Sequence, residues 1–389
     1  MTGVWLLSWR YVAHHRAQTA ILVICLALPV FLPLGTMWVV DRYQSELVVR
    51  AGSTPLVAGA KGNRFDLAMV ALYFRAGPGN AISWAQLEEI QESGLALPIP
   101  INVRHSARGR PIVGTSPEYF ELRRLRPRTG TLPLCLGDVV LGARVAEELG
   151  LAPGGKLASD QKSHHDISKP TALRMSICGV LRKTGTADDG AVFVDVRTTW
   201  VLEGLVHGHR AASKVDPNRV IGKTDHLVHL SPSLIPHQEV TPDNVRNFHY
   251  HGPTHALPLS AIIVIPHDLK GRTLLKARFN ATKRWQMLEP VEVIEELMGF
   301  VFKVKVFLDA YAGVLAIVTS IMAMLVIALS LRLRKAEMRT LDRIGCSRGM
   351  VFLLHAVETL TVLVLSVLLA SGALLILAAS LPQLSKVIE

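Results

Sequence analysis

Three long apolar segments dominate the hydropathy pattern of this chain. Residues 17–40, 310–331 and 359–381 contain no charged side chain. An α-helix needs about 20 such residues to cross the hydrocarbon core of a bilayer. The first segment is longer than the apolar region of a signal peptide, and no small-residue cleavage site follows it. We therefore expect an α-helical membrane protein with three transmembrane helices, the third beginning near residue 351.

The distribution of lysine and arginine predicts the orientation of these helices. Arg10 and Arg16 precede the first apolar segment, and residues 332–350 form a second basic segment. The cations of that second segment are Arg332, Arg334, Lys335, Arg339, Arg343 and Arg348. Basic flanks stay on the cytoplasmic side of a membrane. We therefore expect a multi-pass protein of the cell inner (cytoplasmic) membrane, with its large domain in the periplasm or outside.

The region between the first two apolar segments alternates between helical and strand patterns. Residues 83–93 predict a helix capped by Ser83, and residues 139–151 predict a strand followed by a helix that ends at Gly150. Further strands are predicted at 175–181, 190–196 and 260–266. Because no clean βαβ repeat appears, the pattern indicates a large α+β domain, and two subdomains are compatible with it.

A second helical pattern begins at Pro290 and continues to about residue 338. Proline suits the first helical position, and Glu292 lies in the first turn, where a carboxylate stabilises the helix dipole. We expect one long helix that forms a stalk and then crosses the membrane. The expected organisation is an interfacial helix at 1–16, a first span at 17–40, an extracytoplasmic α+β core domain at 41–289 with a His-rich insertion loop at 200–255, a stalk helix at 290–309, a second span at 310–331, a cytoplasmic coupling loop at 332–350, a third span at 351–381 and an extracytoplasmic tail at 382–389.

Catalytic motifs are not evident in the sequence. "GLAPGGKL", residues 150–157, has the spacing of a phosphate-binding loop, but Leu157 stands where Ser or Thr would hold Mg²⁺. We interpret it as a glycine-rich turn before a strand. Neither a G-x-S-x-G nor an H-E-x-x-H pattern occurs. We therefore expect a chain that is not an enzyme.

Histidines cluster in the second half of the large domain. Between residues 207 and 255 lie His207, His209, His226, His229, His237, His249, His251 and His255. The stretch "HYHGPTH" places His249 and His251 on one face of a strand, with His255 beyond a turn. These three are a candidate Zn²⁺ or Cu²⁺ site, although a polar loop with unconnected histidines and a pH-responsive surface are alternatives.

Two cysteines of the large domain leave a further question open. Cys135 and Cys178 could form a disulfide in an oxidising compartment, but the sequence does not show whether they are close.

The basic segment "RKAEMRTLDRIGCSRG", residues 334–349, resembles the cytoplasmic signature of FtsX-like permeases, the membrane subunits of type VII ABC transporters. The matching residues are Arg334, Glu337, Leu341, Ile344, Gly345, Ser347 and Glu358. In that family this segment is a coupling helix that docks on a separate ATPase subunit. A plain basic loop would need the charges but not the Leu-x-x-Ile-Gly spacing. The resemblance therefore implies docking through these residues.

Parts of the large domain also resemble this family, in its macrolide-exporter (MacB-like) periplasmic core domain. These parts are "GTSPEYFELRRL", "DVVLGARVAEELGLAPGGKL" and "ICGVLRKTGTADDGAVFVDV". Residues 200–255 have no counterpart in the resemblance. Members of the family usually have four transmembrane helices, so a fourth helix is expected to be absent here, supplied by a partner, or lost.

The resemblance implies a non-catalytic permease subunit that works by mechanotransmission. Its expected partners are an ABC ATPase subunit that binds the ATP, a second copy or a related permease, a periplasmic adaptor, and membrane lipid. Nucleic acid is not expected, because the net charge of +11 comes partly from the membrane anchors. No cofactor is expected in the chain itself apart from the candidate Zn or Cu. A lipid, lipoprotein, peptide or drug-like substrate all remain open, and the alternatives are a membrane-anchored metal-binding or sensor protein and a regulator of a cell-envelope enzyme.

Overall fold

The computed structural model divides the chain into two compact units. It describes residues 6, 10, 13–14, 16–75, 81–133, 135–160, 172–208, 220–224, 227–230, 239–241, 243–333 and 348–388. One unit, here called the α+β domain, is Glu46–Glu296. The other, here called the helical unit, consists of Met1–Ser45 and Leu297–Glu389.

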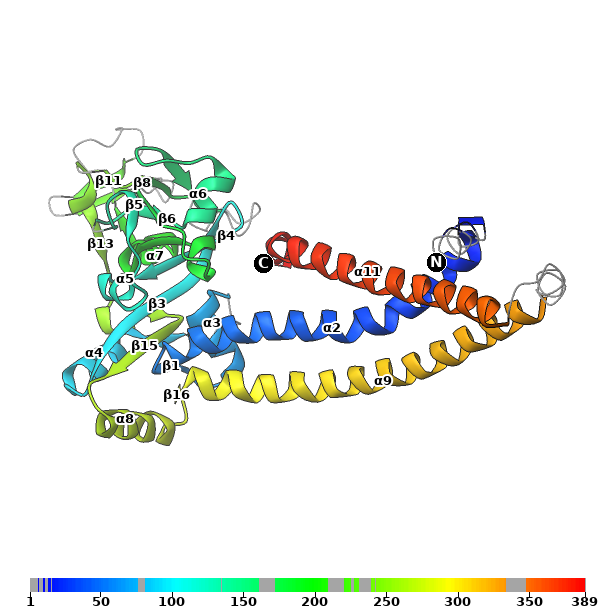
Figure 1. Ribbon diagram of the computed structural model, residues 1–389. Coiled ribbons are helices and arrows are strands. Elements are labelled where there is room, and N and C mark those ends of the chain that lie inside the picture. The colour runs from blue at the N-terminus through cyan, green and yellow to red at the C-terminus, as the bar shows by residue number, and fades with distance from the viewer. Residues whose placement is uncertain are drawn as a thin grey trace. The chain divides into compact units, whose positions relative to one another are not determined.

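The α+β domain is built on a ten-stranded sheet (Figure 1). The strand order is β16-β1-β15-β3-β4-β9-β6-β8-β5, and β7 pairs with β8. The strands are β1 (Leu56–Ala60), β3 (Ala96–Ala107), β4 (Arg110–Thr115), β5 (Pro127–Gly130), β6 (Asp138–Leu141), β7 (Lys156–Ala158), β8 (Arg174–Leu181), β9 (Val192–Asp195), β15 (Ala261–Pro266) and β16 (Trp285–Leu288). Neighbouring strands are antiparallel except for the parallel pairs β4–β9 and β6–β8.

Strand β3 joins the two halves of this sheet. It is 12 residues long, and its first half pairs with β15 while its second half pairs with β4. Three shorter two-stranded ladders complete the domain: β2 (Ile82–Ser83) with β14 (Pro258–Leu259), β10 (Val206–Gly208) with β13 (Phe248–Tyr250), and β11 (Val220–Thr224) with β12 (Leu227–Leu230). The sequence prediction of an α+β domain is confirmed, and its two halves share one sheet.

Short helices cover the sheet. They are α3 (Arg64–Tyr73), α4 (Trp84–Glu92), α5 (Pro117–Leu122), α6 (Ala143–Leu149), α7 (Val196–Leu202) and α8 (Leu269–Ala281), with the 3₁₀ turns η1 (Ala187–Gly190), η4 (Val245–Asn247) and η5 (Thr254–Ala256). The predicted start of α4 is confirmed, since the Gln86 side chain accepts a hydrogen bond from the Ser83 amide at 3.3 Å. Helix α6 ends as predicted at Gly150, which has a φ of +63°.

The core of the α+β domain is aromatic as well as aliphatic. Tyr119 and Phe193 pack against both Phe74 and Phe120, and the contacting ring centroids are 5.5–6.3 Å apart. These rings are buried together with Ile99, Val113 and other strand residues in one hydrophobic cluster. The loop and helix that carry Tyr119 are thereby fixed against the centre of the sheet.

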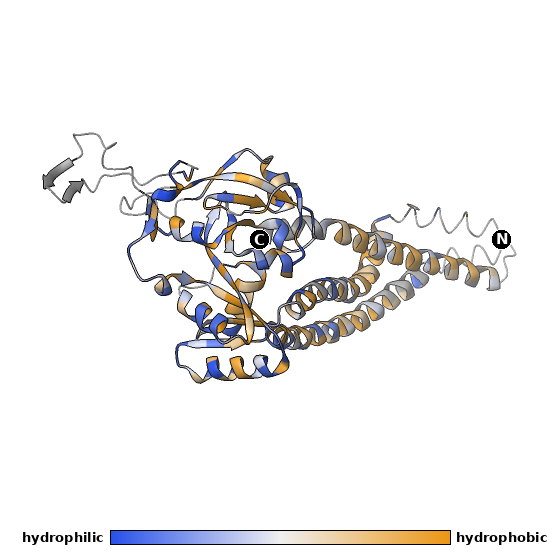
Figure 2. Cartoon of the chain, turned by 90° about the vertical axis from the view of Figure 1, so that its left-hand side faces the viewer, coloured by the Kyte–Doolittle hydropathy of each residue, from blue (hydrophilic) through white to orange (hydrophobic). Residues whose placement is uncertain are grey.

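Three long helices contribute residues to the helical unit. They are α2 (Arg16–Gly52), α9 (Pro290–Leu333) and α11 (Arg348–Ile388), and their apolar composition is visible in Figure 2. Helices α2 and α9 also have a few residues in the α+β domain, whereas α11 belongs to the helical unit alone. Within the described residues, the helices at Thr19–Gly52 and Ala356–Ser380 are long and apolar enough to cross a membrane. The span predicted within α9 stays a prediction.

The structure refines three predicted boundaries. The predicted span ended at residue 40, where charged residues begin. Helix α2 continues beyond it to Gly52, because charged residues do not end a helix and no glycine or proline lies between residue 40 and Gly52. Helix α9 begins at Pro290 as predicted and is continuous to Leu333, and its expected end near residue 338 lies outside the described residues. Most of the expected interfacial helix at 1–16 also lies outside the described residues. The 200–255 segment, expected as a loop, contains the two ladders β10–β13 and β11–β12.

Gly142 provides a test of the packing between β6 and the turn η1. A Cβ atom at this position would lie 2.3 Å from the Asp188 carbonyl oxygen and 2.5 Å from that of Asp189. Because both contacts are backbone atoms, Gly142→Ala should destabilise the α+β domain by about 1–3 kcal/mol. We expect the midpoint of thermal unfolding to fall by roughly 2–4 °C for each kcal/mol.

The matched control is Gly62→Ala. A Cβ at Gly62 has no atom within 4 Å, so this variant should unfold at the wild-type temperature. Equal midpoints for the Gly142 and Gly62 variants would show that the close approach of β6 to η1 is wrong.

Candidate functional site

Arg50, in the last turn of α2, is buried inside the α+β domain. Its side chain is only 5% exposed and forms a bidentate ion pair with Asp188 of η1. Nη1 donates to Asp188 Oδ2 at 2.7 Å, Nη2 donates to Oδ1 at 3.0 Å, and Nε donates to the carbonyl oxygen of Leu72. This geometry is the strongest form of an arginine–carboxylate pair.

The Asp188 carboxylate accepts two further hydrogen bonds. Tyr119 Oη donates to Oδ1 at 2.7 Å, and Thr186 Oγ1 donates to Oδ2 at 2.9 Å. Burial by itself would raise the pKa of Asp188, but the Arg50 charge and these hydrogen bonds lower it below its ordinary value. Burial and the Asp188 charge raise the pKa of Tyr119, which stays a hydrogen-bond donor. We call Arg50, Tyr119, Thr186 and Asp188 the Arg50 cluster.

Aromatic and hydroxyl groups reinforce the Arg50 cluster. The guanidinium carbon of Arg50 lies 5.7 Å from the ring centroid of Tyr73 and 5.6 Å from that of Phe74. Arg123 donates to Ser53 Oγ and Thr54 Oγ1, both at 2.6 Å, immediately after the end of α2. The C-terminal end of α2 is therefore held in one position in the domain.

Sequence reasoning missed the Arg50 cluster. In the sequence, Arg50 is one of several charged residues that follow the first apolar segment, and "GTADDG" is part of a stretch that resembles the periplasmic core domain. The two residues of the ion pair are 138 positions apart. The one local signal was the pair of consecutive acidic residues in a loop between two apolar strands, which does not identify a partner.

A second charged group lies where α9 begins. Glu289 immediately precedes α9 and accepts hydrogen bonds from Arg272 Nε and from Lys276 Nζ, each at 3.1 Å. Lys276 also bonds Glu292 in the first turn of α9 at 3.1 Å. Although partial burial alone would raise the pKa of Glu289, the bonds from Arg272 and Lys276 lower it. Helix α8 thus fastens the first turn of α9 to the domain.

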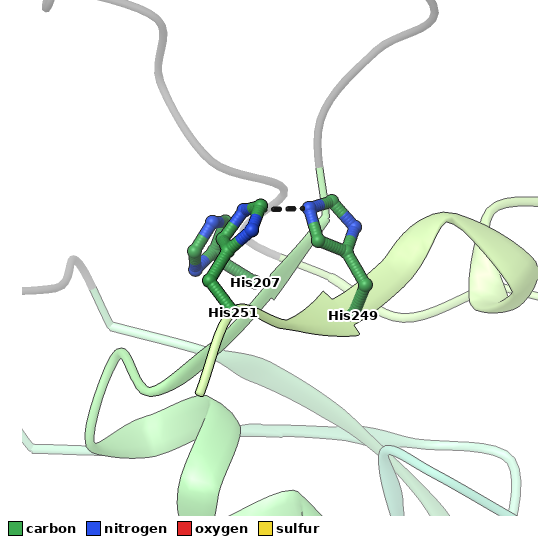
Figure 3. A group of neighbouring side chains, drawn as sticks. All are labelled: His207, His249 and His251. Carbon is green, nitrogen blue, oxygen red and sulfur yellow. Dashed lines mark hydrogen bonds between the residues drawn. The ribbon is translucent and has the colours of Figure 1, made fainter. Parts of the chain in front are cut away.

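Three histidines converge at the β10–β13 ladder (Figure 3). His207 on β10 is the register partner of His249 on β13, and His251 follows β13 directly. One ring nitrogen from each lies within 4.8 Å of the others, and the Nε2 atoms of His249 and His251 are 3.1 Å apart. His207 is partly buried, whereas His249 and His251 are exposed.

The predicted His249–His251–His255 group is therefore corrected in one member. His255 lies in η5, beyond the Gly252–Pro253 turn, and does not belong to the convergent group. His207 takes its place because antiparallel pairing puts it directly opposite His249. The sequence contained His207 in the same His-rich segment but gave no register for β10.

Backbone carbonyls orient two of the three rings. His249 Nδ1 lies 2.8 Å from the carbonyl oxygen of Asn247, and His207 makes a hydrogen bond with the backbone of Gly204. Burial, followed by the neighbouring His249 and His251, lowers the pKa of His207 below its ordinary value.

The residues expected to dock an ATPase fall mostly outside the described residues. This holds for Arg334, Glu337, Leu341, Ile344, Gly345 and Ser347, while Glu358 is half-buried in α11. The segment 334–347 joins the end of α9 to the start of α11. Cys135 and Cys178 are free thiols in the structure.

Two solved structures have limited similarity to this chain. The chain resembles the periplasmic region of MacB from Actinobacillus actinomycetemcomitans at 10% identity and a TM-score of 0.37, covering 64% of this chain and 95% of that one. It also resembles the extracellular domain of the noncanonic ABC-type transporter YknZ from Gram-positive bacteria, at 9% identity and a TM-score of 0.33, covering 60% of this chain and 99% of that one. No protein-family model and no curated protein matches the chain.

The Arg50–Asp188 pair makes a quantitative prediction about stability. Arg50→Met leaves the buried Asp188 carboxylate without its counter-charge, so we expect the free energy of unfolding to fall by about 3–5 kcal/mol. The double variant with Asp188→Asn carries neither charge and should lose clearly less than the sum of the two single variants. Tryptophan fluorescence during denaturant unfolding of the full-length chain measures these differences.

A matched surface pair and a pH series serve as controls. Arg278 and Glu89 form an exposed pair at 2.8 Å, so Arg278→Met should cost at most about 1 kcal/mol. Because folding lowers the pKa of Asp188, its stabilisation is complete above about pH 4 and is lost as the pH falls through the folded-state value. The cost of Asp188→Asn should accordingly shrink in acid. A strictly additive double variant would contradict the coupling.

Proposed function

We propose that this chain is the membrane permease subunit of an ABC transporter, in which a separate ATPase subunit drives movement of the α+β domain. The observation that carries this proposal is the position of residues 334–347, the part of the basic segment that lies between α9 and α11. It combines the Leu-x-x-Ile-Gly spacing with a place between two long helices, one of which is continuous into the α+β domain.

Helix α9 is suited to transmit a displacement. Its 44 residues correspond to a length of about 66 Å at 1.5 Å per residue. Its first turn is fastened to α8 through Glu289 and Glu292, and its last residue directly precedes the basic segment. A force applied to that segment by an ATPase would therefore act on the α+β domain through one continuous helix.

Helix α2 supplies a second connection of the same kind. It runs from Arg16 to Gly52, and the Arg50 cluster holds its end in the core of the α+β domain. The last turn of α2 and the first turn of α9 are thus each held in the domain by charged contacts, which oppose sliding of the helices. We propose that the chain uses them as mechanical links between the cytoplasm and the extracytoplasmic space.

The membrane arrangement completes the proposal. We propose three spans in an inner membrane, the second of them within α9 at 310–331. Apolar side chains on α9 and α11 are exposed in the structure and would contact lipid or a second permease: Val314, Ile317, Ile321, Leu325, Leu363, Val367 and Leu375. In this arrangement two permease chains pair with two ATPase subunits, and the α+β domain acts outside on a lipid, lipoprotein, peptide or drug-like substrate.

Docking of the ATPase is tested by two apolar residues of the basic segment. Leu341→Asp and Ile344→Asp each place a charge where an apolar side chain would enter a cleft of the partner. Loss of a central apolar anchor costs more than about 2 kcal/mol, so we expect each variant to weaken binding roughly 30-fold or more. Co-purification with the ATPase subunit that partners this chain, and the ATPase rate of the complex, measure the effect.

Thr340→Asp is the matched control, since it adds the same charge to the same segment at a polar position. It should retain most of the binding. Undiminished co-purification and coupled ATPase activity in the Leu341→Asp/Ile344→Asp double variant would refute the docking proposal.

The orientation is tested by the natural cysteines. Cys135 is exposed in the α+β domain and Cys346 lies in the basic segment. In right-side-out membrane vesicles, a membrane-impermeant maleimide should label Cys135 at once and Cys346 only after permeabilisation. Cys178 should react slowly, because burial, followed by the nearby Asp138, raises its pKa to about 11.

Single replacements identify which thiol reacts. Cys135→Ser should remove most of the labelling in sealed vesicles, and Cys346→Ser should remove the additional labelling seen after permeabilisation. Prompt labelling of Cys346 in sealed right-side-out vesicles would reverse the proposed topology.

A further inference from the structure

We propose that His207, His249 and His251 form a binding site for one divalent transition-metal ion of the Zn²⁺ and Cu²⁺ class. This inference is independent of the transport proposal, because it depends only on side chains of the β10–β13 ladder.

The spacing of the rings fits a common metal. Zn²⁺ binds imidazole nitrogen at about 2.0–2.1 Å, so two ligands at a tetrahedral angle have nitrogens about 3.3–3.4 Å apart. The Nε2 atoms of His249 and His251 are 3.1 Å apart, and the ring centroids of all three pairs are 4.6–5.2 Å apart. Small rotations of exposed side chains bring three nitrogens to one ion.

The strand pairing preorganises the ligands. His207 and His249 face each other in an antiparallel ladder. His251 follows His249 by two residues, the spacing that places two side chains on the same face of an extended strand. The contact between His249 Nδ1 and the Asn247 carbonyl oxygen leaves Nε2 as the metal-binding atom. Carbonyl groups that hold the remote ring nitrogen in this way are typical outer-shell partners of metal-binding histidines.

The donor set selects the metal class. Among the described residues the convergent group contains three imidazoles and neither a carboxylate nor a thiolate. Imidazole favours Zn²⁺, Cu²⁺ and Ni²⁺, whereas Mg²⁺ and Ca²⁺ require oxygen ligands and Cu(I) favours sulfur. Three protein ligands leave a fourth position, which water would occupy because His249 and His251 are exposed.

The position of the ligands suggests what the ion does for the chain. His207 precedes the segment 209–247, whereas His249 and His251 follow it. A bound ion would therefore fasten the two ends of this insertion to each other at its base, beyond the hydrogen bonds of the β10–β13 ladder. Because the ion binds the folded arrangement of the three rings, its binding free energy stabilises that arrangement against unfolding.

The test uses the full-length chain in detergent, purified through a tag without histidine and stripped with a chelator. Titration with Zn²⁺ against a chromophoric chelator should give one tight site per chain. Loss of an outer-shell partner alone weakens metal binding about 10- to 100-fold, so His207→Ala, His249→Ala and His251→Ala should each weaken it at least about tenfold. His255→Ala, in the same His-rich segment, should leave the affinity unchanged.

Co²⁺ substitution provides a readout that does not depend on the variants. In the wild-type chain, Co²⁺ should give the intense visible absorption of a four-coordinate site. Far-UV circular dichroism of the metal-free variants verifies that they fold. Absence of a stoichiometric Zn²⁺ site in the wild type, a Co²⁺ spectrum of a hexa-aqua ion, or an equal loss in the His255 and His207 variants would each overturn the proposal.

Discussion

The buried pair between Arg50 and Asp188 is the interaction on which the arrangement of the α+β domain depends. An arginine inside a protein is tolerated only where a counter-charge and hydrogen-bond acceptors meet it. The Arg50 charge is neutralised only when the end of α2, the turn η1 with Asp188 and helix α5 with Tyr119 pack against one another. The pair therefore selects one packing of three elements that are far apart in the chain, and it makes the end of a long apolar helix part of the domain core.

The same principle operates where the second long helix begins. Glu289 is bonded by Arg272 and Lys276, so α8 holds the first turn of α9. In both α2 and α9, charged contacts fix one end of the helix. Each helix also has a long apolar stretch whose side chains are largely exposed within the part of the chain that the structure describes. This combination fits a subunit whose helices carry force through a membrane, which is the function we propose. A chain that only anchored a sensor would need the apolar stretches but not the fixed ends.

Local patterns were sufficient to predict several elements. The helix capped by Ser83, the helix ending at Gly150, and strands β8, β9 and β15 are formed by residues that are neighbours in the sequence. The histidine group was only partly predictable for the opposite reason. His249 and His251 share a strand period, but His207 joins them through the register of β10 against β13, which no local pattern contains. The choice of His255 followed sequence proximity, and the turn after His251 takes that residue away from the group.

The sequence by itself determined the apolar segments, their basic flanks, the α+β class of the domain and the spacing of the basic segment 334–347, because hydropathy, charge and helical period are properties of neighbouring residues. The tertiary structure decided the order of the ten strands, the partner of Arg50 and the identity of the third histidine. Each of these depends on contacts between distant parts of the chain, and such contacts form only when the strands have taken one register and the core has closed around it.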